Sequence, residues 1–344
     1  MYKKIFMGIA AVAALTLVSC SSDDLNSLSD NSSKNEAISF DGYWGRSAVS
    51  VNGSRGSVID KAEDLQKVSE GFGVFGNYSS TDGTTPTYGK NWFDNQPVTY
   101  KTSAWTYNPV KYWLPQGHID FLAYAPYDSN QELKENSKLD FTVSSTIANQ
   151  KDLLWANATN QTKTDKPVTF TFNHALAKIG YTVKTNVVGT GGTTITLNKI
   201  TLAGSATDPT TGAFYTKGTI DLSKGNDATD LWTKQDGKQY FTWFNGSQSL
   251  TSTSESNPET DYLFVIPQNF STGTDELYVI VDYTINYNTG AAATMKSTVS
   301  SKLTKNFEQG KAYKINLSIG LTPIEFDADV TTWKDTEQKD VHWN

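Results

Sequence analysis

The chain has 344 residues and a formal net charge of −7 at pH 7, and this acidic balance excludes nucleic acid as a partner, because phosphate binding requires clustered cations. Aromatic residues make up 12% of the chain, which excludes a disordered protein. The many Thr, Ser, Asn and Gly residues, set against few helix formers, predict an all-β fold.

The chain begins with the pattern of an export signal. A short positive start precedes an apolar run over 5–18, which is shorter than the roughly 20 residues of a membrane-spanning helix. The run ends in LVSC at positions 17–20, which matches a bacterial lipobox. We therefore predict a cleaved lipoprotein signal peptide over 1–19 and lipidation of Cys20. The alternative is a signal peptide followed by a chance cysteine.

Cys20 is the only cysteine, so it cannot form an internal disulfide. Acyl chains on this residue would hold the exported precursor at the cell outer membrane. Residues 20–36 are polar and predict a flexible tether. Asp23 and Asp24 resemble acidic signals that send lipoproteins to the outer face of the membrane, although a merely solvated linker explains them equally well.

The body of the chain consists mostly of short segments with strand patterns. Alternating polarity and β-branched or aromatic content predict strands at 73–78, 97–100, 119–124, 168–172, 177–184, 194–202, 218–222, 262–266, 277–287, 294–303 and 312–319. One segment, 61–70, predicts a helix. A polar stretch near 160–166 suggests a boundary between an N-terminal β-sandwich domain over 37–165 and a C-terminal one over 166–344.

No pattern predicts catalysis, a metal site or a cofactor. The three histidines, His118, His174 and His342, are too far apart in sequence to form a zinc-binding pair, and His174 in its apolar context suggests a structural residue. No nucleophile motif is present. A glycosidase needs two carboxylates that face one another across a cleft. The sequence contains 36 acidic residues but does not show which of them meet, so this third alternative has no support.

The chain has only two arginines, Arg46 and Arg55, and both come shortly after the tether. Two explanations stand side by side. One is a compositional preference for lysine with chance placement. The other is that an arginine-specific protease cuts the chain here and nowhere in the folded body.

Two segments near the ends of the chain share one alternation of polarity. The apolar positions are Ile38, Phe40, Gly42 and Trp44 in the first segment, and Ile324, Phe326, Ala328 and Val330 in the second. A cut after Arg46 would release the first strand and leave an incomplete sheet, which a strand of another subunit could complete. The alternative is that both are ordinary strands of closed sandwiches.

Several further motifs, in this order behind a lipobox, resemble the fimbrillin family, the subunits of type V pili. They are Trp105, Tyr107, Tyr112, Trp113 and Pro115; 121–126, FLAYAP; 151–156, KDLLWA; 170–179, FTFNHALAKI; 264–268, FVIPQ; and 313–317 with Val330 and Trp333.

The resemblance implies two transthyretin-like β-sandwich domains, export to the surface and polymerisation by donor-strand exchange. Carried onto this sequence, it implies lipidation of Cys20, cleavage between Arg46 and Ser47 (second choice Arg55 and Gly56), displacement of the strand with Ile38, Phe40, Gly42 and Trp44, and donation of the strand with Ile324, Phe326, Ala328 and Val330. The implied partners are other pilus subunits, the membrane before maturation, a maturation protease and a surface ligand.

The leading hypothesis is therefore a structural or adhesive subunit of a fimbrium at the cell surface, with no enzymatic activity. The alternative is a surface glycan-binding lipoprotein of a polysaccharide-uptake system. In that case, the nine tryptophans would supply exposed platforms for sugar stacking. Buried tryptophans would argue against it.

Overall fold

The computed structural model describes residues 36–44, 62–81, 83, 85–187, 191–225, 228–258, 261–287, 293–321 and 325–332, all within one compact unit, Asn35–Asn344. Nearly all regular structure is β, as the composition predicts. The segments predicted as strands all lie in observed strands, with ends that differ by a few residues.

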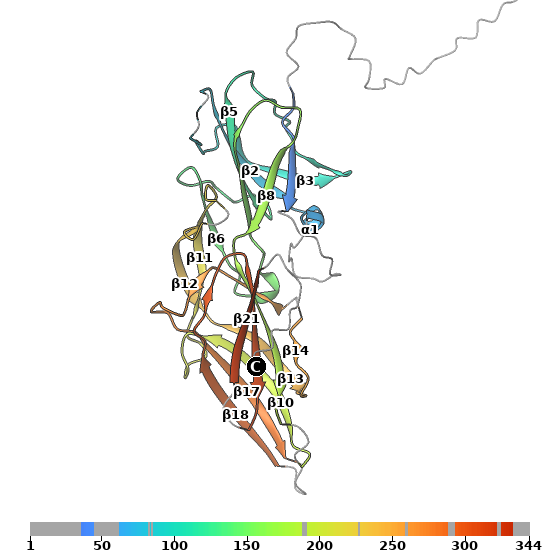
Figure 1. Ribbon diagram of the computed structural model, residues 1–344, viewed down its shortest axis with the longest axis vertical. Coiled ribbons are helices and arrows are strands. Elements are labelled where there is room, and N and C mark those ends of the chain that lie inside the picture. Colours follow the sequence, from blue (N-terminus) through green and yellow to red (C-terminus); the bar gives the residue numbers. More distant parts are fainter. Residues whose placement is uncertain are drawn as a thin grey trace, which may run out of the picture. The chain divides into compact units, whose positions relative to one another are not determined.

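A seven-stranded sheet contains every described strand up to β8 except β6 (Figure 1). In sheet order they are β1 (Phe40–Trp44), β8 (Val168–His174), β7 (Leu154–Gln161), β5 (His118–Ala125), β2 (Phe72–Ser79), β3 (Phe93–Lys101) and β4 (Ala104–Thr106). β1 pairs with β8 in parallel, and the other neighbours are antiparallel. The edge strands β1 and β4 also contact one another, so the sheet curls around an apolar interior.

The helix α1 (Ala62–Lys67) packs near β1 and β3 and contributes Leu65 to this interior. It ends three residues earlier than the predicted 61–70. The chain reverses at this point, because the Gly71 amide donates to the Val68 carbonyl at 3.0 Å and Gly71 has a φ of +68°. A Cβ at Gly71 would lie 2.0 Å from the Val98 carbonyl oxygen, so only glycine fits this turn.

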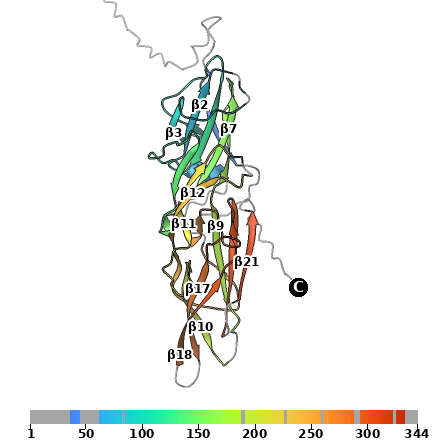
Figure 2. The ribbon, with the colours of Figure 1, turned by 90° about the vertical axis from the view of Figure 1, so that its left-hand side faces the viewer.

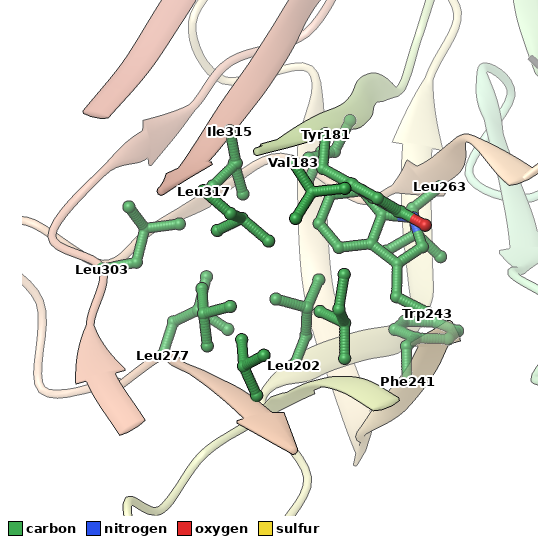
Figure 3. Close-up of a cluster of buried hydrophobic side chains, with 14 of the residues drawn as sticks. Tyr181, Val183, Leu202, Phe241, Trp243, Leu263, Leu277, Leu303, Ile315 and Leu317 are labelled. Atoms are coloured by element: carbon green, nitrogen blue, oxygen red, sulfur yellow. The ribbon is translucent and has the colours of Figure 1, made fainter. Parts of the chain in front are cut away.

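A second core lies between two further sheets. One contains β13 (Phe241–Ser249), β10 (Thr194–Ala203), β17 (Tyr278–Tyr287) and β18 (Ala293–Lys302), of which β10, β17 and β18 lie side by side in Figure 2. The other contains β14 (Glu255–Ser256), β9 (Ala177–Thr185), β20 (Lys311–Ile319) and β21 (Glu325–Thr332), with β15 (Leu263–Val265) also paired to β9. Figure 3 shows side chains from the two sheets meeting, with Ile315 and Leu317 directed toward Leu202 and Leu277.

Two smaller sheets and one short turn complete the described elements. A three-stranded sheet has the order β12 (Trp232–Gln239), β11 (Phe214–Asp221) and β6 (Lys138–Thr142). β16 (Gln268–Asn269) pairs with β19 (Asn306–Phe307), and a single 3-10 turn, η2, covers Ile147–Asn149. A third apolar cluster packs β11 against the outer face of the seven-stranded sheet and includes Ile220 and Trp155.

The domain boundary at 165/166 stays a prediction. β8 follows this position in the chain but lies in the sheet of N-terminal strands, and β6 precedes it but pairs with β11. The polar stretch 160–166 connects β7 to β8.

Candidate functional site

The candidate site is the position of β1, which appears as the dark-blue strand beside β8 in Figure 1. Ile38, just before the strand, is 1% exposed, and Phe40 is 4% exposed. The ring of Phe40 lies 5.3–5.7 Å, between centroids, from four other rings, which belong to Phe93, Tyr107, Phe121 and Phe170. An edge strand therefore supplies the centre of an aromatic core. We call the surface that it covers the β1 seat, defined by these four rings with Leu65, Trp105 and Phe172.

Backbone groups hold the segment in this seat. The Ile38 amide donates to the Lys111 carbonyl at 2.8 Å, and the Val168 amide donates to the Ser39 carbonyl at 2.8 Å. The Tyr107 hydroxyl donates to the Ile38 carbonyl at 2.7 Å. Since these bonds use only the main chain of the segment, they do not depend on its side chains.

Burial raises the pKa of Tyr107, so its hydroxyl keeps the proton that it donates to Ile38. The Lys111 amide in turn donates to the Tyr107 hydroxyl at 3.2 Å. The Lys111 ammonium lies 4.8 Å from the centre of the Phe93 ring and donates to the Trp92 carbonyl. These contacts fix the loop after β4 against the segment around Ile38.

Gly42 marks a narrow part of the β1 seat. A Cβ at this position would lie 3.2 Å from Leu65 Cδ2, 3.5 Å from Phe172 Cε2 and 3.6 Å from Trp105 Cζ2. A single methyl group therefore fits after a small movement of the Leu65 side chain, whereas a larger side chain does not. Trp44 pairs by its backbone with Phe172, and its side chain lies outside the described residues.

The predicted donor segment, 324–330, overlaps β21, the edge strand of its sheet. It is antiparallel to β20, with Phe326 opposite Leu317, Ala328 opposite Ile315 and Val330 opposite Tyr313. Val330 is 46% exposed, although it is an apolar residue. Ile324 and the side chains of Phe326 and Ala328 lie outside the described residues.

The processing sites predicted from the sequence lie outside the described residues. These sites are Cys20, the pair Arg46 and Ser47, and the pair Arg55 and Gly56. Residues 45–61, which contain both arginines, join β1 to α1 along the chain.

The described tryptophans belong to the interior rather than to a sugar-binding face. Among the described side chains, Trp113, Trp155 and Trp243 are buried, and Trp92, Trp105 and Trp232 are partly buried and pack against apolar clusters. In the described part of the chain, no tryptophan platform supports the glycan-binding alternative.

Histidine and carboxylate side chains pair in the interior. His174 Nδ1 lies 3.0 Å from Asp152 Oδ2, and both residues are buried, in agreement with a structural role for His174. His118 Nε2 lies 3.3 Å from Asp120 Oδ2. The described residues contain no group of three or more potential metal ligands. No helix among them is long and apolar enough to cross a membrane.

Sequence reasoning placed β1 at the site but missed the residues that retain it. Tyr107 and Lys111 hold a segment that is about 70 positions away in the chain. No local pattern identifies such a contact, and the only available signal was the cluster of aromatic residues over 105–113.

Comparisons with known proteins agree with this architecture. A family model described as fimbrillin-like matches residues 61–333. The fimbrium subunit Fim1C of Phocaeicola vulgatus is 24% identical over 391 aligned positions, which cover 97% of this chain and 98% of that protein. The crystal structure of a fimbrial protein from Bacteroides vulgatus superposes with a TM-score of 0.67 at 21% identity, and covers 87% of this chain and 100% of the other.

Proposed function

The chain belongs to the fimbrillin-like family, and on this premise we propose that it is a structural subunit of a fimbrium at the cell surface. The family consists of fimbrial subunits rather than enzymes, which confirms the prediction that the protein is not an enzyme. The all-β fold predicted for it is also confirmed.

The proposed assembly mechanism is donor-strand exchange at the β1 seat. The observation that carries it is the burial of Ile38 and Phe40 by an edge strand that pairs with β8 alone. Fully burying one such side chain is worth about 1.5–3 kcal/mol. Loss of the strand would expose the aromatic interior and the unpaired backbone of β8, so another strand that fits the seat would be captured.

The position of the two arginines supports proteolysis as the trigger. Cleavage after Arg46, or after Arg55 as second choice, would cut the covalent link between β1 and α1. β1 would then be retained only by its non-covalent contacts. Before the cut, the occupied seat keeps the precursor monomeric.

The precursor is proposed to reach the outer membrane as a lipoprotein anchored through Cys20. The lipobox over 17–20 supports this step. Labelled palmitate should enter the full chain but not the Cys20→Ser variant. Labelling of both chains would overturn the assignment of the lipid to Cys20.

The decisive experiment is treatment of residues 21–344, which include the whole compact unit, with an arginine-specific protease. We expect a new N-terminus at Ser47 and ladders that resist detergent. The Arg46→Lys variant should lose that N-terminus, Arg55→Lys should behave like the parent, and the Arg46→Lys/Arg55→Lys chain should give neither a cut nor ladders. A chain that also lacks 322–344 should be cut but remain monomeric. A parent chain that stays monomeric after a clean cut would contradict donor-strand exchange.

A further inference from the structure

We propose that residues 324–330 of a second copy of this chain enter the β1 seat in one register and one direction, with Phe326 in the place of Phe40 and parallel to β8. This inference rests on the proposed function. It adds the identity of the partner, a copy of the same chain, and the alignment of the two strands.

The two segments share more than their alternation of polarity. The first reads ISFDGYW over 38–44, and the second reads IEFDADV over 324–330. Isoleucine, phenylalanine and aspartate occupy the same three positions, and the smallest residue of each segment, Gly42 or Ala328, follows directly. The chain thus carries near its C-terminus a close copy of the strand that cleavage would free.

The site around Phe40 selects the register. Its ring is surrounded by four aromatic rings with centroid distances of 5.3–5.7 Å, so the site fits another phenylalanine. A shift of two residues would place Ile324 or Ala328 there and leave a cavity or a poorly fitting branched side chain. A shift of one residue would turn Glu325 or Asp327 into the aromatic interior, where burial of a carboxylate is costly.

The position of Gly42 excludes large side chains two residues further on. Leu65, Phe172 and Trp105 approach a Cβ there at 3.2, 3.5 and 3.6 Å. In the proposed register, this position receives Ala328, whose single methyl group meets only the mobile end of Leu65 at short distance. The site therefore accepts the smallest residue of the donor and rejects its neighbours.

The same asymmetry sets the direction. In the reverse direction, with Phe326 still among the four rings, Ile324 would fall at the Gly42 position and Ala328 at the fully buried Ile38 position. Ile324 would then clash with the side chains around the Gly42 position, and Ala328 would leave a void at the Ile38 position. In the parallel direction, the main chain of Ile324 would take over the hydrogen bonds that Ile38 makes with Lys111 and Tyr107.

The partner is a second copy because the matching segment belongs to this chain and lies at the edge of its sheet. β21 pairs only with β20, and its Val330 is 46% exposed. In the β1 seat, the isoleucine and phenylalanine positions are those of Ile38 and Phe40, which are almost fully buried.

Cysteine pairs test the register directly. Asp41 lies opposite Thr169 across the parallel pair, and both side chains are exposed. Neighbouring strands lie about 4.8 Å apart, which is within disulfide range. In the proposed register Asp327 takes the place of Asp41. Since Cys20 is the only native cysteine, residues 21–344 provide a cysteine-free background.

We expect the T169C/D327C chain, cut and then mildly oxidised, to give covalent ladders on non-reducing denaturing gels. The matched pairs T169C/E325C and T169C/D329C should give at least tenfold less covalent product. The uncut D41C/T169C precursor, which should close an internal disulfide, verifies that these positions can be joined. Stronger linking through E325C or D329C would overturn the register or the direction.

A measurement of polymer size separates this inference from the proposed function. If the cut parent chain forms polymers but T169C/D327C polymers are not covalently linked, exchange stands and the register is wrong. If the cut parent chain forms no polymers, both the inference and the proposed function fail.

A second pair of variants tests the register without cysteines. The A328L variant should abolish assembly, while V330L should retain it. Equal assembly of these two variants would also contradict the register.

Discussion

The hydroxyl of Tyr107 donates a hydrogen bond of 2.7 Å to the main-chain carbonyl of Ile38, and so ties the loop after β4 to the segment that leads into β1. The bond recognises backbone rather than a side chain. It therefore serves any strand that occupies this place, whether the chain's own or that of a second copy.

The Tyr107→Phe variant should weaken the retention of the N-terminal segment without disturbing the aromatic core. Loss of this hydrogen bond is expected to lower the free energy of unfolding by about 0.5–1.5 kcal/mol. Chemical denaturation of the uncut precursor measures the change. Tyr112→Phe is the matched control, because Tyr112 is 48% exposed and should change stability by less than about 0.5 kcal/mol. Equal effects of the two variants would refute the role of Tyr107.

The Phe40→Ala variant should be strongly destabilised. The ring of Phe40 is almost fully buried among four other rings, and truncation of such a residue typically lowers the free energy of unfolding by about 3–5 kcal/mol. Asp41→Ala, at the neighbouring exposed position, is the control and should be nearly neutral. Thermal unfolding of the uncut precursors compares them. A Phe40→Ala protein as stable as the parent would mean that β1 contributes little to the core.

Gly42 should accept alanine but not valine. The methyl group of Gly42→Ala meets Leu65 Cδ2 at 3.2 Å, which a small side-chain movement relieves, so we expect a change of less than about 1 kcal/mol. Gly42→Val adds two further carbons near Phe172 and Trp105 and should cost about 1–3 kcal/mol. Denaturation midpoints of the two variants distinguish them. Equal stability would show that the β1 seat is wider here than the contacts indicate.

Gln150 should stabilise the contact between the turn η2 and strand β15. Its side-chain oxygen accepts from the Phe264 amide at 2.8 Å, and its amide group donates to the Ser144 carbonyl at 3.2 Å. Gln150→Ala is expected to lower the free energy of unfolding by about 1–3 kcal/mol, because the Phe264 amide and the Ser144 carbonyl lose these hydrogen bonds. The exposed neighbour variant Asn149→Ala is the control and should have little effect in the same denaturation assay.

Stability should be insensitive to moderate alkali and then fall. Burial raises the pKa of Tyr88, Tyr181 and Tyr313 to about 12 each, from 10.0. The pKa values of these tyrosines are higher in the folded than in the unfolded chain. Their contribution to the free energy of unfolding is therefore complete below pH 10 and is lost as pH rises from about 10 to 12. Melting temperature against pH, with tyrosinate absorbance, measures it. Ionisation of these tyrosines near pH 10 without loss of structure would contradict it.

The strand pattern of this protein could be predicted from the sequence because it is local. Alternation at 168–172 and 312–319 requires only neighbouring side chains on opposite faces of a strand. β12 was not predicted, since its sequence, WTKQDGKQ, has little apolar alternation and its pairing with β11 holds it in place. The helix was predicted too long, because the turn at Gly71 depends on packing against Val98.

The sequence by itself thus determined the all-β class, the positions of most strands, and the matching apolar pattern of 38–44 and 324–330. These features depend on periods of two residues and on residue types. Only the tertiary structure decided that β1 lies parallel to β8, that Phe40 lies among four rings, and that the Tyr107 hydroxyl donates to the Ile38 carbonyl. Each of these relationships joins positions far apart in the chain, and their partners are chosen by the packing of the whole fold rather than by any local pattern.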